Sequence, residues 1–235
     1  MSCKAGAKRV RILGLETATQ RASVGLLIDG EVVVEQSVPA QGSHAVSLLP
    51  LIDAVLRQAD CGVDALDAVA VSSGPGSFTG LRVGISVAKG FARATGVRLV
   101  AVPTLEALAR TVPGAPGMVC ALLDARKGEL YAACFESSAG GCRRLTADRL
   151  VTPEALVALL PTPCVVVGDG VTVCESVLRG QLGERVTLLP AETHGPRGGV
   201  IAALGWERLQ AGQLADVPSL EPTYVRPSEA ELKVA

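Results

Sequence analysis

Residues 72–84 read SSGPGSFTGLRVG and join a short apolar run to a helix. The run before them, DAVAVS at 67–72, is typical of a strand that is buried on both faces. A Gly-Pro-Gly turn ends this strand. Ser77 is then a suitable N-cap for a helix that we expect to continue to Thr95, with Gly96 as its C-terminal glycine. The stretch therefore predicts a strand-turn-helix unit of an α/β protein.

The expected helix has one face that is almost free of side chains, because Gly80, Gly84 and Ala88 recur at intervals of four. Each interior glycine costs about 1 kcal/mol of helix propensity relative to alanine, so a close contact must compensate. The residues alone leave three explanations open: packing inside the protein's own fold, a surface for a partner helix, or a phosphate-binding loop. The phosphate loop is the weakest, because neither the P-loop ending nor the dinucleotide glycine spacing is present.

The composition is typical of a cytoplasmic α/β protein. Of the 235 residues, 49% are hydrophobic but only 3% are aromatic, which suits aliphatic parallel strands covered by helices. The net charge of -1 and the absence of long like-charge runs give no electrostatic footprint of an autonomous nucleic-acid binder. Seven cysteines without a CxxC pair predict buried thiols in a reducing compartment. No apolar run has the length of a membrane span or of a leader's apolar region.

One order of elements occurs twice along the chain. From Val10 to Val102 we expect three strands, a helix, a strand, a helix and a strand, with Asp29-Gly30 as a two-residue hairpin turn. Residues 119–189 repeat this order more faintly, including one strand at 143–151. The order predicts two similar lobes with mixed sheets flanked by helices.

The lobe boundary is expected near the proline- and glycine-rich segment 113–117, the best linker candidate. We assign residues 1–105 to the first lobe and 106–235 to the second. The last helix, at about 199–210, is expected to pack back on the first lobe.

The first helix of the chain is expected at 44–58, with Ser43 as its candidate cap. Pro50 lies inside it and removes one backbone donor, which predicts a bend. Its apolar face comprises Leu48, Leu51, Ile52, Val55, Leu56 and Ala59.

Paired lobes of this order resemble the actin-like ATPase (ASKHA, ribonuclease H-like) fold, and three motifs narrow the resemblance. They are SGPGSFTGLRVG at 73–84, DARKGELY at 124–131 and PTYVR at 222–226. With them the chain resembles the TsaB (YeaZ) family from about Ile12 to Arg226. Glu16, where relatives commonly have Asp, and Lys127, where many have a second Arg, depart from the pattern but keep the charge.

The resemblance implies a noncatalytic, dimerising subunit of the machinery that makes threonylcarbamoyladenosine (t6A) at position 37 of tRNAs reading codons that begin with A. It implies helix-mediated binding to the catalytic subunit TsaD, with the ATPase TsaE joining the pair and tRNA contacted only through the complex. A homodimer through the same helices is the alternative assembly. No cofactor is expected in the isolated chain, and ATP or ADP is expected only at the complex interface.

We assign the partner interface to residues of the two first-lobe helices. They are Leu48, Leu51, Ile52, Val55, Gly80, Arg82, Val83, Gly84, Val87 and Ala88. Arg82 and Lys89 can bind phosphate or an acidic partner, or can simply be solvated at the helix edge.

An autonomous small-molecule kinase or ATPase is the alternative function, and its candidate residues are Glu16 and Asp124. They end the first strand of each lobe, where they either hold a magnesium-water cluster across the cleft or accept turn amides. The first loop, 17–23, has no glycine that would let its backbone close around a phosphate.

The histidines argue against a metallopeptidase, because His44 and His194 are far apart and cannot form a ligand pair within one helix. We expect His44 to be a solvated or capping residue and His194 to lie in a loop. Ser77 lacks the Gly-x-Ser-x-Gly context of a nucleophile elbow, and the cysteines lack any catalytic signature.

Overall fold

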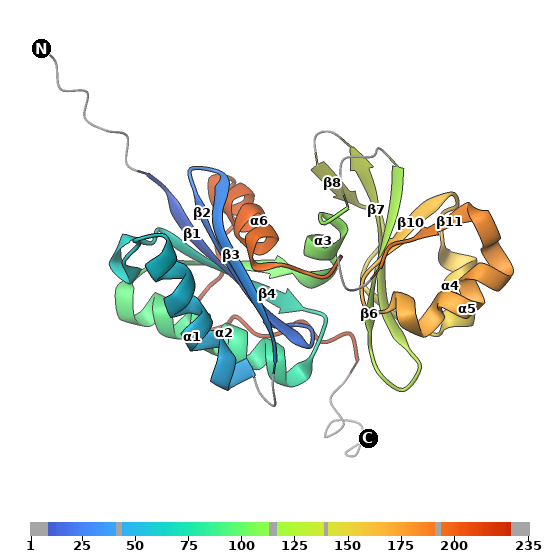
Figure 1. Cartoon of the computed structure of the whole chain (residues 1–235), viewed down its shortest axis with the longest axis horizontal. Coiled ribbons are helices and arrows are strands. Elements are labelled where there is room, and N and C mark those ends of the chain that lie inside the picture. The colour runs from blue at the N-terminus through green and yellow to red at the C-terminus, as the bar shows by residue number, and fades with distance from the viewer. Residues whose placement is uncertain (1–8, 41–43, 113–116, 139–140, 191–193, 227–235) are drawn as a thin grey trace, which may run out of the picture.

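The computed structural model describes residues 9–40, 44–112, 117–138, 141–190 and 194–226 and contains two α/β lobes that lie side by side (Figure 1). The first lobe is built on a five-stranded sheet in the order β3-β2-β1-β4-β5. Its strands are β1 (Arg11–Glu16), β2 (Arg21–Ile28), β3 (Glu31–Pro39), β4 (Ala68–Gly74) and β5 (Arg98–Pro103). Because β1 pairs antiparallel with β2 and parallel with β4, the sheet is mixed, as predicted.

Helices cover both faces of the first sheet. On one face lie α1 (His44–Gln58) and α2 (Phe78–Thr95), and on the other lies α6 (Gly198–Gln210), which contacts β1, β2 and β4 (Figure 1). Alternate residues of the strands supply the two cores: Leu13 and Leu15 face α1 and α2, whereas Ile12 and Leu27 face α6. The last helix of the chain thus belongs to the first lobe.

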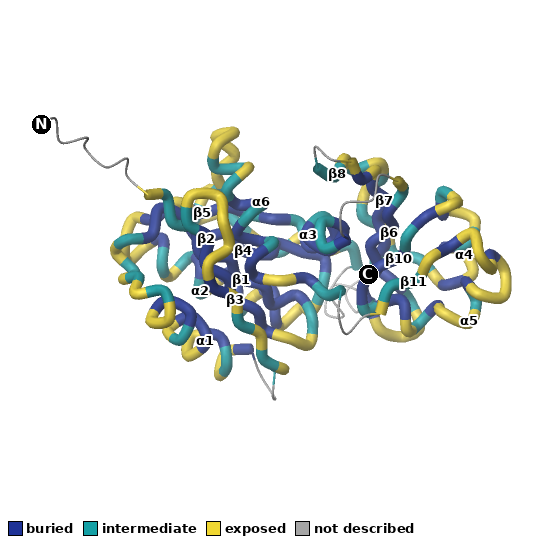
Figure 2. The backbone as a smooth tube through the Cα atoms, turned by 45° about the horizontal axis from the view of Figure 1, so that its top comes forward, coloured by how far each residue is buried: buried dark blue, intermediate teal, exposed yellow. Residues whose placement is uncertain are grey.

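The second lobe repeats the plan on a six-stranded sheet in the order β11-β10-β6-β7-β8, with β9 paired to β7. Its strands are β6 (Gly117–Asp124), β7 (Leu130–Ser138), β8 (Gly141–Arg144), β9 (Arg149–Val151), β10 (Cys164–Val167) and β11 (Val186–Leu188). Its helices α4 (Pro153–Leu159) and α5 (Val171–Leu182) cover one face, and α3 (Thr104–Ala109) lies against the other. Figure 2 shows both sheets as the buried centres of their lobes.

Local sequence signals place most of these elements correctly. The helix at 44–58 is confirmed, Ser77 accepts a hydrogen bond from the Gly80 amide as an N-cap, and Gly96 closes α2 with φ of 73°. Asp29 and Gly30 have positive φ values, as a two-residue hairpin turn requires. The candidate cap Ser43 and most of the linker 113–117 lie outside the described residues.

One expectation in the second half is wrong, and one helix near the lobe boundary was not expected. The strand expected at 143–151 is divided into β8 and β9, because the chain turns between them and the amides of Leu145 and Thr146 both donate to the carbonyl of Cys134. The short helix α3 was not expected, because its six residues are too few to show a periodic pattern.

The segment after α6 runs back over the first lobe and ends on the second. Its contacts along the first lobe include the Ala215 amide to Leu99 O at 2.8 Å and the Thr223 amide to Ser73 O at 2.7 Å. Arg226 then donates to Ala125 O at 3.0 Å and forms an ion pair with Glu129 in the second lobe. The tail therefore connects the lobes at the edge where their first hairpins meet.

Candidate functional site

The side-chain-poor stripe of α2 lies inside the first lobe. A Cβ atom at Gly80 would overlap the carbonyl oxygen of Thr17, and one at Gly84 would overlap the Thr17 hydroxyl. His44, the first residue of α1, comes within 3.0 Å of the same Gly80 position. Ala88 is fully buried as well. The stripe thus receives the loop after β1 and the start of α1.

The predicted partner surface is therefore wrong for seven of its residues, because the chain buries them itself. On α2 they are Gly80, Gly84 and Ala88, and on α1 they are Leu48, Leu51, Ile52 and Val55. The apolar face of an amphipathic helix covers its own sheet, and these residues form that face. The other three predicted residues reach the surface: Arg82 is exposed, and Val83 and Val87 are half-buried.

The outward sides of α1 and α2 carry a different set of apolar groups. Val46 is 73% exposed and Leu49 is 53% exposed on α1, which is high for large aliphatic side chains. On α2 the exposed positions near Val83 and Val87 include Ser86 and Gly90, which add little side chain. We define the α1–α2 surface as Val46, Leu49, Phe78, Arg82, Val83, Val87 and Tyr224.

Three residues of the α1–α2 surface hold one another in place. The Arg82 guanidinium lies 3.7 Å from the centroid of the Phe78 ring and donates from Nε to the Tyr224 hydroxyl at 2.9 Å. The Phe78 and Tyr224 rings stack with centroids 5.1 Å apart. Cation–π contact and stacking restrict all three side chains before any partner arrives. The tail thus fixes an arginine and two aromatic rings at the surface of the first lobe.

Backbone groups of the loop after β1 are engaged by the protein itself. The amides of Thr17 and Ala18 donate to Ser72 Oγ and to Glu16 Oε1, and the Ala18 carbonyl accepts from the Ser77 amide at 2.7 Å. In actin-like ATPases the equivalent hairpins hold phosphates with such amides. The amides of Thr17 and Ala18 are therefore already occupied by hydrogen bonds within the lobe.

The corresponding loop of the second lobe is engaged in the same way. The amide of Asp124 donates to Asp169 Oδ1 at 3.0 Å, that of Ala125 to Glu129 O, and that of Arg126 to Asp124 Oδ1 at 2.7 Å. The amide oxygen of Gln20 accepts from the Arg126 guanidinium, so the first hairpins of the two lobes are in contact.

Three carboxylates converge near this meeting point. Burial raises the pKa of Glu16 to about 7, against hydrogen bonds from the Ala18 amide and Ser72. Burial also raises the pKa of Asp169, and the charge of Asp124 adds to that rise. Both oxygens of Asp124 accept hydrogen bonds from Arg126. Glu16 Oε1 accepts from the Ala18 amide, whereas Glu16 Oε2 is buried without a hydrogen-bond partner. Among the described residues, no group of three or more His, Cys, Asp or Glu side chains is placed to hold a metal ion.

The raised pKa of Glu16 makes stability depend on pH. The unfolded chain releases the Glu16 proton near pH 4.5 and the folded chain near pH 7. The contribution of Glu16 to the free energy of unfolding is therefore fully present below pH 4.5 and is lost as the pH rises through 7. Urea unfolding should show that the free energy of unfolding falls by about 3 kcal/mol between pH 4.5 and pH 7 because of Glu16. In Glu16→Gln this loss should be absent, and equal pH slopes for the two proteins would contradict the assignment.

His44 is a buried structural residue, whereas a solvated or capping histidine was expected. Its Nε2 lies 2.9 Å from the carbonyl oxygen of Thr19. Burial lowers its pKa. The ring therefore fastens the loop after β1 to α1 as a neutral imidazole.

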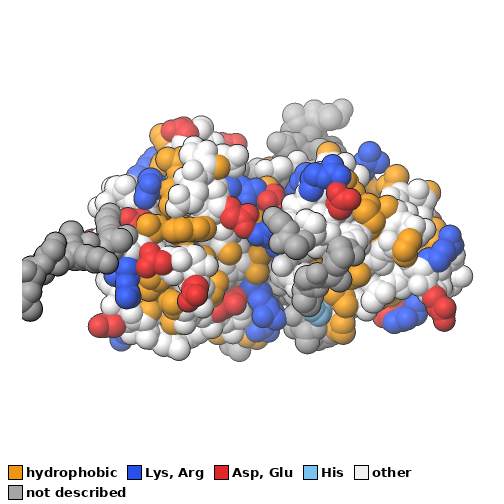
Figure 3. Space-filling view, turned by 90° about the horizontal axis from the view of Figure 1, so that it is seen from above, with side chains coloured by type: hydrophobic (Ala, Val, Ile, Leu, Met, Phe, Trp, Pro, Cys, Tyr) orange, Lys and Arg blue, Asp and Glu red, His pale blue; other side chains and the backbone are white. Residues whose placement is uncertain are grey.

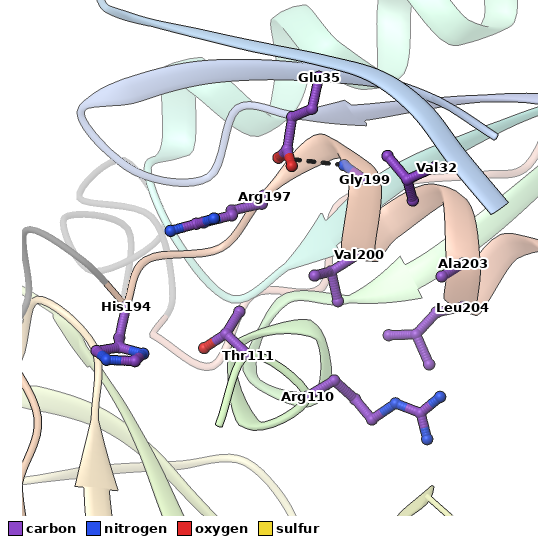
Figure 4. Close-up of a pocket in the computed structure, with 10 residues that line it drawn as sticks. All are labelled: Val32, Glu35, Arg110, Thr111, His194, Arg197, Gly199, Val200, Ala203 and Leu204. Atoms are coloured by element: carbon purple, nitrogen blue, oxygen red, sulfur yellow. Dashed lines mark hydrogen bonds between the residues drawn. The ribbon is translucent and has the colours of Figure 1, made fainter. Parts of the chain in front are cut away.

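A separate pocket of about 540 Å³ lies between β3, α6 and the end of α3 (Figure 4). His194 lines it, as do Arg110 and Arg197. At the N-terminus of α6, the Gly199 amide is already hydrogen-bonded, because Glu35 Oε1 accepts from it at 3.3 Å. Arg110 is held in an ion pair with Glu207. On the face in Figure 3, acidic and basic side chains are likewise interspersed rather than gathered by sign.

Comparison with known proteins settles the family. A family model described as TsaD, tRNA N6-adenosine threonylcarbamoyltransferase, matches residues 33–178. The TsaB protein of Bacillus subtilis is 28% identical over 94% of this chain and 96% of its own length. The chain belongs to the TsaB (YeaZ) family, within the wider family that the TsaD model describes. The TsaB protein of Haemophilus influenzae is 36% identical over 53% of each chain.

Solved structures agree with this family and show that more distant proteins share the same fold. YeaZ from Pseudomonas aeruginosa superposes with a TM-score of 0.79 and 27% identity, over 92% of this chain and 99% of its own. An ROK hexokinase from Thermus thermophilus gives a TM-score of 0.51 with 13% identity, over 86% of this chain and all of its own. The hexokinase shows the fold alone, which is the actin-like fold that the element order predicted. Within the described residues, no helix combines the length and apolarity needed to traverse a bilayer.

Proposed function

We propose that this chain takes part in t6A biosynthesis as a noncatalytic subunit that binds and supports a TsaD transferase. Its relatives from Bacillus subtilis, Haemophilus influenzae and Escherichia coli are named as t6A biosynthesis proteins TsaB. The observation that carries the proposal is the α1–α2 surface, where Val46 and Leu49 are exposed on α1 and where an arginine and two aromatic rings are fixed at α2 and the tail. Exposed aliphatic groups with Arg and Tyr anchors have the composition of a protein interface.

The similarity to TsaD supports that partner. A tRNA N6-adenosine threonylcarbamoyltransferase from Anaeromyxobacter dehalogenans is 34% identical over 41% of this chain. Related chains can associate through equivalent surfaces about a pseudo-two-fold axis, as identical chains do about a true one. The α1 and α2 helices would then pack against their counterparts in TsaD. A homodimer through the same helices is the expected assembly when TsaD is absent.

The noncatalytic role is supported by the hydrogen bonds of the first hairpin of each lobe. Both hairpins that hold phosphates in actin-like ATPases use amides for the protein's own groups, namely Ser72, Glu16, Asp169 and Glu129. The bond-making step then belongs to the partner. ATP or ADP, if bound, would lie at the junction of the complex, where the ATPase TsaE joins, and tRNA would contact the assembled complex.

Reconstitution tests this function. TsaD and TsaE of the same organism, incubated with tRNA and substrates, should form t6A far faster with this chain present than without it. The modified nucleoside is measured by mass spectrometry after digestion. A matched reaction with Leu159→Asp, an exposed position on α4, controls for nonspecific effects. Equal rates with and without the chain would refute the proposal.

The alternative, an autonomous small-molecule kinase or ATPase, makes a separate prediction about the isolated chain. It requires binding of ATP with magnesium, which calorimetry measures directly. We expect no binding heat, because the hairpin amides are engaged. Micromolar binding by the purified chain would favour the kinase instead.

A further inference from the structure

Two thiols face each other inside the second lobe. Cys120 on β6 and Cys134 on β7 are direct partners in the antiparallel register, and their Sγ atoms are hydrogen-bonded at 3.6 Å. Both side chains belong to the core cluster that includes residues of α4 and α5. These two helices cover one face of the second sheet (Figure 1). They are consequently neighbours in space although the intervening hairpin separates them in sequence.

The backbone geometry at this pair suits a cross-strand disulfide. The Cys134 amide donates to Thr146 Oγ1 at 2.9 Å, and its carbonyl accepts from the Leu145 amide at 2.9 Å. These groups point away from β6, so Cys120 and Cys134 form a non-hydrogen-bonded pair, whose Cα atoms lie about 4.5 Å apart in antiparallel sheets. That separation falls within the range of about 4.4–6.8 Å seen in disulfides. Bond formation requires the two sulfurs to rotate together without moving the strands.

The two thiols differ in reactivity. The hydrogen bond to Cys120, with further help from Thr146 and the charge of Arg149, lowers the pKa of Cys134. The same bond and complete burial raise the pKa of Cys120. Cys134 is 6% exposed whereas Cys120 is fully buried. Of the two sulfurs, Cys134 therefore forms a thiolate more readily, and Cys120 lies in position to react second.

The neighbouring thiols of the same core serve as internal comparisons. Burial raises the pKa of both Cys164 and Cys174 to about 11. The Cys174 thiol donates to Gly170 O at 3.3 Å within its own helix. Buried thiols with such raised pKa values are inert toward oxidants.

We propose that Cys120 and Cys134 are a site of reversible oxidation to a disulfide by hydrogen peroxide. The Cys134 thiolate attacks one peroxide oxygen, the O–O bond breaks and hydroxide leaves, which gives a sulfenic acid at Cys134. The Cys120 sulfur then attacks Cys134 Sγ, the S–O bond breaks and water leaves. In sum, two thiols and one peroxide give one disulfide and two waters, and a dithiol reductant reverses the change.

The expected consequence lies in the β6–β7 hairpin. The disulfide would join its two strands below the loop at 124–130, which contacts the tail through Ala125 and Glu129. The proposed disulfide forms within the chain, so it does not depend on the proposed binding to TsaD.

Peptide mapping of the full chain tests the site. Trypsin places Cys120 in residues 111–126, and it leaves Cys134 with Cys142 in residues 128–143, which chymotrypsin divides after Phe135. After native peroxide treatment and alkylation, we expect linkage of the Cys120 and Cys134 peptides in most chains, reversed by dithiothreitol. The linked Cys120–Cys134 peptide should be absent from Cys120→Ser and from Cys134→Ser. It should still form in Cys174→Ser, which removes a thiol that is as deeply buried as Cys120.

The wild-type chain alone decides the question if a serine variant does not fold. A parallel sample oxidised in denaturant shows which links arise without the native register. Absence of the Cys120–Cys134 peptide from the native sample, or conversion of Cys134 to sulfinic acid without linkage, would overturn the proposal.

Discussion

Replacing Gly80 with alanine should lower the free energy of unfolding by about 3 kcal/mol, the upper part of the range for overpacked sites. The new Cβ would overlap the Thr17 carbonyl oxygen, which belongs to backbone and is held at a fully buried residue. Relief would require α2 to move away from the loop after β1. The gain in helix propensity, about 1 kcal/mol at most, offsets only part of this cost. Urea unfolding monitored by circular dichroism measures the change.

Gly90→Ala is the matched control, because it makes the same substitution in the same helix. An added Cβ at Gly90 would meet nothing within 4 Å, so this variant should be more stable by about 0.5–1 kcal/mol. Equal effects at the two positions would show that the stripe is not a close contact within the lobe. Substitution of Gly84 is also expected to affect stability through a close contact within the lobe, because its Cβ would overlap the Thr17 hydroxyl.

The double substitution Val46→Asp and Leu49→Asp should weaken binding to TsaD by at least about 100-fold, as loss of hot-spot residues does. Both side chains are more than half exposed, so the variant is expected to fold normally. In the proposed helix contact, the two carboxylates would be buried without partners. Calorimetric titration of TsaD with the variant measures the change in Kd.

Leu159→Asp is the control for this surface, since Leu159 on α4 of the second lobe is 41% exposed. It should leave the affinity for TsaD within about twofold, as a position outside the interface does. A double variant that binds like the wild type would place the partner elsewhere, even if the chain remains necessary for t6A formation. The surface and the function are thus tested separately.

Much of the local structure follows from short-range patterns. The Asp29-Gly30 turn, the cap at Ser77 and the boundaries of the first helix depend on neighbouring residues, and each is confirmed. The repeated order of strands and helices likewise predicts the two mixed sheets. These features were accessible because turns, caps and helix periodicity are decided within a few residues of chain.

The error about the partner surface has a physical origin. An apolar helix face and a glycine stripe both indicate that something approaches closely, but neither identifies what approaches. The periodicity selected the buried residues of α1, such as Leu48 and Val55, rather than the exposed Val46 and Leu49. Exposed aliphatic residues break the amphipathic pattern, and that departure is the signal which could have located the surface.

By itself, the sequence determined most of the elements and their order, the actin-like architecture and the family. Only the tertiary structure decided that Thr17 fills the space above Gly80, that Tyr224 holds Arg82, and that Cys120 faces Cys134. Each of these contacts joins residues from separate elements, so its existence depends on how whole helices and strands are placed. Local propensity carries no information about such distances, because the chain between the partners can follow many paths before packing selects one.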